Sequence, residues 1–480
     1  MASQSHELFP RLECCTKWMS DETIHDVKFY PYATEDDDQI FAFTGCTDTV
    51  VCRPKRGADP PFEVLKCFRD KDADCAYNSL AWTKCPETGT PWLCIAGAEP
   101  KHIKILNIDT GKPVRCLTGH GKGINDLAVS PLSTHLLASC AEDATIRLWS
   151  LAPRFGKQPC VALFAGAGNR APILAIHFHP NGKWLLSGGI DTAVCLWAVP
   201  ALDELERAED SSRASEPLIV YYPHFFSKEL HPNYVDCFAF YGDLILSKAA
   251  RGADSDKKKG GKLNEILLWK IEGFDSDKPP PEDPPIPEPA QQTRSSFPHN
   301  EGFRGFRRLL TFKIPHTDRF YHRFGLLHAP NVRPILCMGN QESQYLFWDM
   351  QRLEEGIDPQ DRPVSRAKKR GKQRKGTALL GDLQGRSESV AGSSSRGTPE
   401  ASTTTAADER EYTLGDAFLP LEAHESVTAN TKLSAKTHFA TAQIAWSPDA
   451  TTMVGVGDRG MICMFYRDKS VVRTGIGREE

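Results

Sequence analysis

Residues 119–150, GHGKGINDLAVSPLSTHLLASCAEDATIRLWS, contain three short strand-like segments joined by tight turns. The first segment, INDLAV, ends in a branched residue shortly before a proline, and the middle segment, LLASCA, is rich in small side chains. The last segment, TIRLW, alternates polar and apolar residues, as a half-buried strand does, and ends in Trp149. The stretch therefore predicts a small antiparallel sheet.

The same order of segments recurs along the chain, next in APILAIHFHPNGKWLLSGGIDTAVCLW at 171–197. Seven first segments end at the anchor residues Phe29, Trp82, Val129, Phe178, Phe240, Phe324 and Trp446. Seven last segments read DTVVC, HIKIL, TIRLW, AVCLW, EILLW, QYLFW and MICMF. The unit resembles the WD40 repeat of about 40–45 residues. The two matching counts predict an all-β fold, a seven-bladed WD40 β-propeller of four-stranded sheets.

Four polar residues of the 119–150 copy fit the hydrogen-bonded tetrad of WD repeats, namely His120, Ser139, Asp143 and Trp149. Asp191 and Trp197 repeat part of this set in the next copy. We assign these residues a structural role rather than a catalytic one. The other copies lack the full set, so apolar packing is expected to hold those blades together.

Compositional shifts divide the chain. Residues 1–20 are expected to contribute the closing strand, residues 21–470 to form the propeller, and residues 471–480 to form a tail. Polar insertions are expected at 251–264, at 272–303 and at 351–420. The second is Pro-rich and acidic, hence extended and solvated. The third is basic, then rich in Ser and Thr with few apolar residues, and is expected to be disordered.

Charge and hydropathy limit the partners. The formal net charge of −4 gives no reason to expect a nucleic-acid or membrane partner. No apolar run reaches the roughly 20 residues that a membrane-spanning helix needs. One basic run, 366–375, is a solvated loop, a nuclear-import signal or a weak DNA contact. The 15 cysteines, without a secretion signal, are expected to be reduced core residues of an intracellular protein. The adjacent Cys14 and Cys15 are the candidate metal ligands among the cysteines, and we expect no metal.

The sequence contains no convincing catalytic motif. GVGDRG at 455–460 matches a dinucleotide fingerprint, but a strand-like segment follows where that fingerprint needs a helix. We therefore expect a non-catalytic protein without a cofactor. A propeller enzyme is the alternative from another class, and it would require an acid–base pair with perturbed pKa values at the centre of the propeller.

Four stretches carry a more specific resemblance: DADCAYNSLAWT at 72–83, LTGHGKGINDLAVSP at 117–131, HPNYVDCFAFYGDLILSKAA at 231–250, and DRFYHRFG at 318–325. Together they resemble the EED/extra sex combs family, the WD40 subunits of Polycomb repressive complex 2. The resemblance implies a nuclear scaffold of transcriptional silencing that supports and stimulates an enhancer-of-zeste-type histone methyltransferase, beside a Su(z)12-type subunit. It also implies that a trimethylated histone H3 tail binds in an aromatic cage at the channel mouth.

The stretch HTDRFYHRF at 316–324 is the strongest candidate for that cage. If it is an inner strand, Phe320 and Tyr321 point to opposite faces and cannot both enter one core. Counting four residues back from each anchor gives the predicted mouth positions His25, Asn78, Asn125, Leu174, Asp236, Phe320 and Ala442.

The resemblance and the mouth positions together assign the cage to Phe320, Tyr321 and His25, with Arg323 and Asn78 as supporting or peptide-contacting residues. Tyr77, one residue before the mouth position of its blade, is added to the cage because a β-bulge would re-aim its ring. The family's two further cage aromatics align with His25 and Asn78, neither of which is a large aromatic residue, so a weaker cage is expected. The runner-up function is a scaffold that binds the methyltransferase but has lost methyl-lysine reading.

Overall fold

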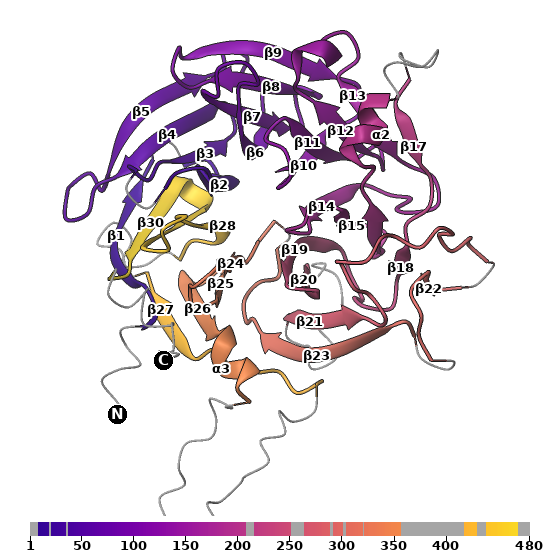
Figure 1. Cartoon of the computed structure of the whole chain (residues 1–480). Coiled ribbons are helices and arrows are strands. Elements are labelled where there is room, and N and C mark those ends of the chain that lie inside the picture. The colour runs from indigo at the N-terminus through magenta and orange to yellow at the C-terminus, as the bar shows by residue number, and fades with distance from the viewer. Residues whose placement is uncertain are drawn as a thin grey trace, which may run out of the picture.

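Seven sheets stand around a central axis, each beginning with a strand near that axis and ending at the rim (Figure 1). The structure is a computed structural model. It describes residues 8–18, 21–34, 37–207, 216–250, 264–288, 291–300, 304–319, 321–356, 417–429 and 438–468. The seven-bladed β-propeller predicted from the repeats is confirmed.

The first three blades follow the chain in order. Blade 1 contains β2 (Asp26–Phe29), β3 (Phe41–Gly45), β4 (Asp48–Pro54) and β5 (Phe62–Arg69). Blade 2 contains β6 (Tyr77–Lys84), β7 (Pro91–Gly97), β8 (His102–Asn107) and β9 (Lys112–Thr118). Blade 3 contains β10 (Ile124–Val129), β11 (Leu136–Ala141), β12 (Ile146–Ser150), β13 (Cys160–Phe164) and a fifth strand, β17 (Leu218–Val220).

The remaining blades repeat this plan. Blade 4 contains β14 (Ile173–Phe178), β15 (Trp184–Gly189), β16 (Val194–Ala198), β18 (Phe225–Ser227) and a fifth strand, β22 (Thr293–Ser295). Blade 5 contains β19 (Val235–Tyr241), β20 (Leu244–Ala249), β21 (Glu265–Ile271) and β23 (Phe306–Lys313). Blade 6 contains β24 (Gly325–Leu327), β25 (Ile335–Gly339), β26 (Gln344–Asp349) and β27 (Glu425–Thr428). Blade 7 contains β28 (Thr441–Trp446), β29 (Thr452–Gly457), β30 (Met461–Tyr466) and β1 (Arg11–Lys17).

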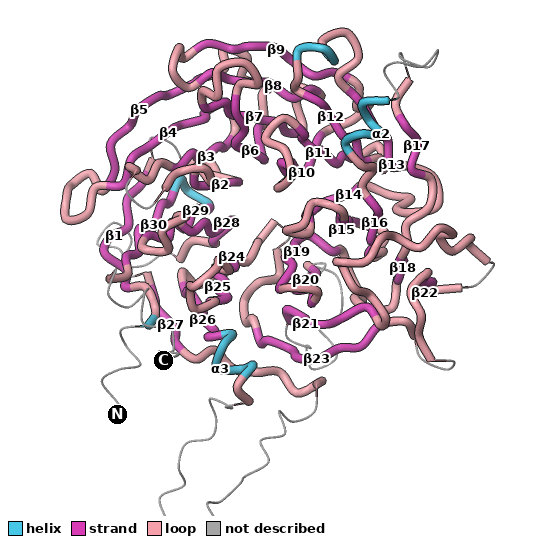
Figure 2. The backbone as a smooth tube through the Cα atoms, in the orientation of Figure 1, coloured by secondary structure: helices cyan, strands magenta, loops and turns pink. Residues whose placement is uncertain are grey.

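Helices are few in the described residues (Figure 2). α2 (Leu202–Arg207), α3 (Met350–Glu354) and the 3-10 turn η1 (Pro153–Phe155) lie at the rim, and the 3-10 turn η2 (Asp458–Gly460) joins β29 to β30. None of the described helices is long and apolar enough to span a bilayer.

Apolar packing is divided among seven clusters of described residues, one between each pair of adjacent blades. The middle strands are buried on both faces, as in β11, where every residue of LLASCA is buried. Small side chains suit such a strand because two neighbouring sheets pack closely against its faces. This explains why the middle segment of each repeat is poor in large polar residues.

The ring is closed by strands from opposite ends of the chain. β1 pairs antiparallel with β30, so the N-terminal strand forms the outer strand of blade 7 beside the last strand of the sequence. Because every blade then has two neighbours, the sheets leave no gap in the ring, and only short outer edges remain.

Three insertions return to the blade before their own. β17 lies between strands of blade 4 yet pairs parallel with β13 of blade 3. β22 lies between strands of blade 5 yet pairs with β18 of blade 4. Leu421, between strands of blade 6, bridges Phe312 of β23 in blade 5. Each insertion thereby covers an outer edge that would otherwise present unpaired backbone groups.

The Pro-rich insertion differs from its predicted solvated form. Its final part supplies β22, and Phe297 just beyond is 5% exposed, with its ring centroid 5.6 Å from that of Trp184. The aromatic side chain at the end of the insertion explains the docking, since burying it removes a large apolar surface from water. Most of the other two predicted insertions, 251–263 and 357–416, lies outside the described residues, as does the basic run 366–375.

The tetrad of blade 3 is assembled. Trp149 Nε1 donates to Ser139 Oγ at 2.8 Å, His120 Nε2 lies 2.7 Å from the same oxygen, and His120 Nδ1 lies 3.0 Å from Asp143. Burial alone would raise the pKa of Asp143, but His120 and neighbouring donors lower it well below its usual range. This series of hydrogen bonds connects the loop before β10 to the turn between β11 and β12.

Two further blades carry related locks. In blade 4, Trp197 donates to Ser187 at 2.9 Å, and Ser187 donates to Asn169, which replaces the histidine. In blade 5, Trp269 donates to Ser247 at 2.9 Å, and His231 lies 2.7 Å from that hydroxyl. The expectation that blade 5 relies on apolar packing alone is therefore wrong. The insertion between Ser247 and Trp269 hid their relation in the sequence.

Candidate functional site

The inner strands of five blades contain a bulge near their first residue. The pairing register skips one residue in β6, β10, β14, β19 and β28. The extra residues are Asn78, Asn125, Leu174, Asp236 and Ala442. A bulge bends its strand and re-aims the extra side chain. These five residues are among the mouth positions predicted by counting four residues back from each anchor. The count therefore located a β-bulge that recurs in five inner strands.

The register of blade 6 differs from the prediction. Leu336 pairs with both Trp348 and Leu326, just as Leu137 of blade 3 pairs with both Trp149 and Val129. The anchor of blade 6 is therefore Leu326 rather than Phe324. The fourth residue back is His322, not Phe320.

The described residues 316–319 and 321–324 belong to no strand. β24 begins only at Gly325, and Tyr321 has a positive φ of 63°, in the left-handed region. The argument that Phe320 and Tyr321 face opposite sides of a strand therefore fails, because strand alternation does not apply to this backbone. Phe320 itself lies outside the described residues.

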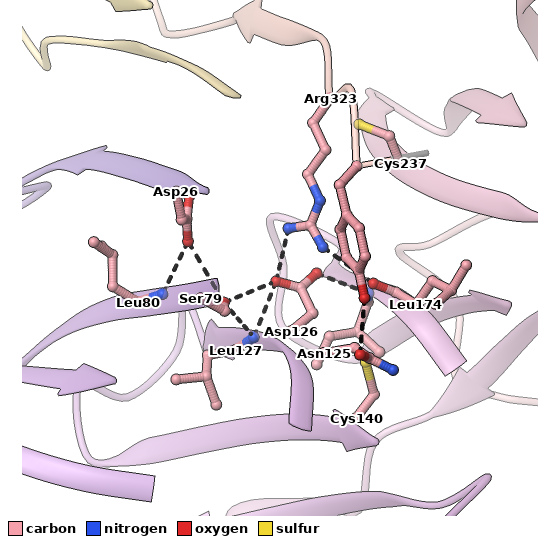
Figure 3. A network of polar contacts seen from close by, with 12 residues as sticks. Asp26, Ser79, Leu80, Asn125, Asp126, Leu127, Cys140, Leu174, Cys237 and Arg323 are labelled. Atoms are coloured by element: carbon pink, nitrogen blue, oxygen red, sulfur yellow. Dashed lines mark hydrogen bonds and ion pairs between the residues drawn. The ribbon is translucent and has the colours of Figure 1, made fainter. Parts of the chain in front are cut away.

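Seven positions are equivalent because each lies three residues before the anchor of its blade. We call them the axial ring: Asp26, Ser79, Asp126, Ala175, Cys237, Arg323 and Gln443. Asp126 and Arg323 come from blades on opposite sides of the ring, and Arg323 Nη1 donates to Asp126 Oδ1 at 3.0 Å (Figure 3). Since both side chains are almost fully buried, this pair joins blades 3 and 6 through the axis.

Hydrogen bonds extend this pair into a network across the axis. Arg323 Nη2 donates to the Leu174 carbonyl at 3.0 Å, and Ser79 Oγ donates to Asp126 at 3.2 Å. Asp26 accepts from the Leu80 amide at 2.9 Å. Burial alone would raise the pKa of Asp126, but Arg323 and the nearby Lys28 lower it, so this carboxylate is ionised.

Tyr321 is held in the centre of the same network. Its hydroxyl donates to Asn125 Oδ1 at 2.8 Å, and its amide donates to Asp236 Oδ2 at 3.0 Å. The Arg323 amide donates to the Ala442 carbonyl at 2.8 Å. The loop is thus anchored on blades 3, 5 and 7. Burial raises the pKa of Tyr321, so its hydroxyl stays protonated and acts as a donor.

A second ion pair, between Asp236 and Lys248, supports the backbone of Tyr321. Lys248 Nζ lies 3.0 Å and 3.1 Å from the two carboxylate oxygens of Asp236, and both side chains have no exposed surface. Burial raises the pKa of Asp236 against the opposing effect of Lys248. Because Asp236 also accepts the Tyr321 amide, the ion pair fixes the start of this loop.

Asp26 and Asp126 of the axial ring and the neighbouring Asp236 each have a cationic partner. Asp26 has Lys28 at 3.3 Å, Asp126 has Arg323, and Asp236 has Lys248. A paired carboxylate is a poor general base. The arrangement therefore suits a rigid support for an aromatic residue better than acid–base catalysis. Among the described residues, no group of three or more histidine, cysteine or acidic side chains is arranged to hold a metal ion.

Two of the predicted site residues, Tyr77 and Arg323, have buried side chains. Tyr77 is 1% exposed, packs between blades 1 and 2, and donates its hydroxyl to Asp70 at 2.8 Å. The bulge re-aims Asn78 and leaves Tyr77 in the core, so the assignment of Tyr77 to a cage is wrong. Arg323 is paired with Asp126 and buried, with its guanidinium carbon 5.9 Å from the centre of the Tyr321 ring, a position that fits the supporting role predicted for it.

His25 lies next to the axial ring, one residue before β2, and its amide donates to the Thr44 carbonyl at 2.9 Å. Burial lowers the pKa of its imidazole, Asp26 opposes this, and Arg323 lowers it further. The ring is therefore neutral at pH 7. Asn78, at the equivalent position of blade 2, has a buried side-chain oxygen without a hydrogen-bond partner.

The sequence reasoning missed Asp126, Asp236 and Lys248 as functional supports. One signal was available, because lysine is rare inside a small-residue strand such as LILSKA of β20. Such a lysine needs a buried partner. The identity of that partner follows only from the closing of the ring.

Comparison with known proteins agrees with this architecture. The model of the WD domain, G-beta repeat, matches residues 111–150 and 158–198. The chain is 41% identical over 343 residues to the Polycomb protein EED of Chaetomium thermophilum, an alignment that covers 69% of this chain and 57% of that protein. It also resembles a chain in a solved structure of ctPRC2 in complex with H3K27me3 and H3K27M, with 32% identity and a TM-score of 0.75 over 96% of this chain and 98% of that one. The chain belongs to the EED/extra sex combs family.

More distant family members have similar coverage. The Polycomb protein esc of Drosophila virilis is 26% identical over 337 residues, which is 68% of this chain and 70% of that protein. The chain spans 57% of the length of its C. thermophilum EED relative. The resemblance stated from four short stretches of sequence is thus confirmed at the level of the family.

Proposed function

We propose that this EED family member is a non-catalytic scaffold subunit of a nuclear Polycomb repressive complex 2. In that complex it would contact an enhancer-of-zeste-type methyltransferase and a Su(z)12-type subunit. Support comes from the family membership and from the likeness to a chain in solved structures of the complex. The buried and paired axial carboxylates also favour a scaffold over an enzyme.

We further propose that the scaffold reads a trimethylated lysine of a histone H3 tail at the axial mouth. One observation carries this proposal: Tyr321 lies where loops of several blades meet, fixed by Asn125 and Asp236. A quaternary ammonium has no N–H to donate, so it is attracted to the faces of aromatic rings without hydrogen bonds. Phe320, the adjacent aromatic in the sequence, is the proposed second ring.

The scaffold without methyl-lysine reading is the second candidate. It is favoured by the placement of Tyr77 in the core and by Asn78, which offers no aromatic face at the mouth. His25 is the remaining ring of the proposed cage, and its neutral imidazole can accept a cation nearby. The two candidates differ in one measurable property, the preference for methylated over unmethylated peptide.

Replacing Tyr321 by alanine should weaken binding of a trimethyl-lysine histone H3 peptide by roughly twofold to thirtyfold, the range expected for one cation–aromatic contact of about 0.5–2 kcal/mol. Calorimetric titration of the full chain with methylated and unmethylated peptides measures this. Tyr321→Phe should keep most of the affinity, since it loses only the hydrogen bond to Asn125. His25→Phe should tighten binding by supplying a larger ring.

Tyr221→Ala is the matched control, because this tyrosine is 52% exposed and follows β17 at the outer edge of blade 3. It should bind the methylated peptide like the wild type. Equal affinity of the wild type for methylated and unmethylated peptides would reject methyl-lysine reading and leave the scaffold alone. Loss of copurification with the methyltransferase in every variant would instead indicate unfolding.

A further inference from the structure

Two thiols face one another across the strand pair that closes the ring. Cys15 of β1 and Cys463 of β30 are direct partners in the antiparallel register, and their Sγ atoms lie 3.1 Å apart. Directly opposite residues of such a pair have Cα atoms about 4.5–5.5 Å apart. Disulfides span Cα separations of about 4.4–6.8 Å, so the backbone already suits a bond between these residues.

The surroundings make the two thiols unequal. Cys463 is fully buried, whereas Cys15 is partly exposed, and both pack in the cluster between blades 6 and 7. Burial raises the pKa of Cys463, while the hydrogen bond from Cys463 lowers the pKa of Cys15. The thiolate is the reactive form of cysteine, so Cys15 is the more reactive and the more accessible of the two.

Cys14 provides a contrast within the same strand. It packs against the cluster between blades 7 and 1, on the other face of the sheet from Cys15, and its register partner is Met464. Burial and the neighbouring Cys15 raise the pKa of Cys14 to about 11. Cys14 therefore has neither a facing thiol in the register nor a favoured thiolate.

We propose that Cys15 and Cys463 form a redox site at which a peroxide joins the first and last strands of the propeller through a disulfide. The Cys15 thiolate attacks one peroxide oxygen, the O–O bond breaks, and Cys15 becomes a sulfenic acid. The departing hydroxide takes up the proton that the Cys15 thiol had released and leaves as one water. The Cys463 sulfur then attacks the Cys15 sulfur, displaces the hydroxyl group, and its proton leaves with that group as a second water. The two thiols lose two electrons in total, and hydrogen peroxide gains them.

The disulfide would change the closure of the ring from noncovalent to covalent. Strand β1 is held to blade 7 by its pairing with β30, so a bond between Cys15 and Cys463 prevents the strand from separating. The closed loop would contain almost the entire chain. A long loop restricts the unfolded chain strongly, which favours the folded state. The site acts on closure and is independent of the proposed methyl-lysine site.

Peptide mapping of the native full chain tests the proposal. The protein is treated with hydrogen peroxide at low stoichiometry, alkylated, and digested with trypsin without reduction. Cleavage at Arg11, Lys17, Arg459 and Arg467 releases LECCTK at 12–17 and GMICMFYR at 460–467. We expect these two peptides to be recovered cross-linked, and the melting temperature of the oxidised chain to rise by about 5 °C. Recovery of both peptides alkylated and unlinked overturns the proposal.

Variants identify the reacting sulfur. Cys14→Ser should retain the cross-link, whereas Cys15→Ser should abolish both the cross-link and the rise in melting temperature. A cross-link that persists in Cys15→Ser but disappears in Cys14→Ser would overturn the assignment. Cys463→Ala serves as a second loss-of-site variant, and the wild-type map stands by itself if that variant does not fold. A cross-link that forms only in urea would show that the folded protein does not use the site.

Discussion

Replacing Lys248 by methionine is expected to lower the free energy of unfolding by about 3–5 kcal/mol, because it leaves the buried Asp236 carboxylate without a cation. Both side chains of this pair are completely buried. The variant keeps the length and the apolar stem of the lysine, so lost packing contributes little. Urea unfolding followed by tryptophan fluorescence measures the change, since Trp269 lies in the neighbouring strand.

A second substitution separates the charge from the shape. Adding Asp236→Asn to Lys248→Met removes the unpaired charge while keeping an acceptor for the Tyr321 amide, and most of the stability should return. Lys278→Met is the matched control, because its ion pair with Asp275 is exposed and the variant should unfold like the wild type. A Lys248→Met protein as stable as the wild type would mean that Asp236 is not ionised in the folded chain.

The stability of the propeller is expected to fall as the pH is lowered from 7 to 5. Burial lowers the pKa of His177 and of His224 to about 4, and the pKa of His231 to about 3. An unfolded histidine has a pKa of about 6.5, so between pH 6.5 and 4 the unfolded chain binds more protons than the folded chain. Stability is therefore complete above about pH 6.5 and is lost toward pH 4.

The contribution of His177 alone should be about 2 kcal/mol between pH 7 and pH 5. His177→Gln should accordingly lose less stability than the wild type over that interval. The axial carboxylate Asp126, whose pKa is lowered, titrates below this window and does not contribute to the difference. Identical pH profiles for the variant and the wild type would show that burial does not lower the pKa of His177 in the folded protein.

The repeat pattern was sufficient for the number of blades, because the anchor and the last strand of each repeat reflect local packing. It was not sufficient for the register of blade 6, where Phe324 and Leu326 are both apolar and only strand pairing distinguishes them. The mouth positions were found in five blades because a bulge recurs at the same distance from the anchor. Tyr77 was misplaced because that same bulge returns it to the core.

The axial network was beyond sequence reasoning for a different reason. Asp126 and Arg323 are 197 residues apart, and each is an ordinary charged residue when only its own segment is considered. Their pairing depends on the diameter of the closed ring, which no local pattern encodes. The hydrogen-bonded set of His231, Ser247 and Trp269 in blade 5 shows the same limit on a smaller scale, since an insertion separated Ser247 from Trp269.

The antiparallel closure determines how the molecule would respond to mechanical force. Arg11 pairs with Tyr466 and Lys17 pairs with Met461, so the outward ends of β1 and β30 lie side by side. Tension applied to the two ends of the chain would load the hydrogen bonds of this pair one after another, like a zipper, rather than all together in shear. Rupture should therefore begin at blade 7 under low force. Blades 3 to 6, which the insertions of blades 4, 5 and 6 connect to one another, should extend last.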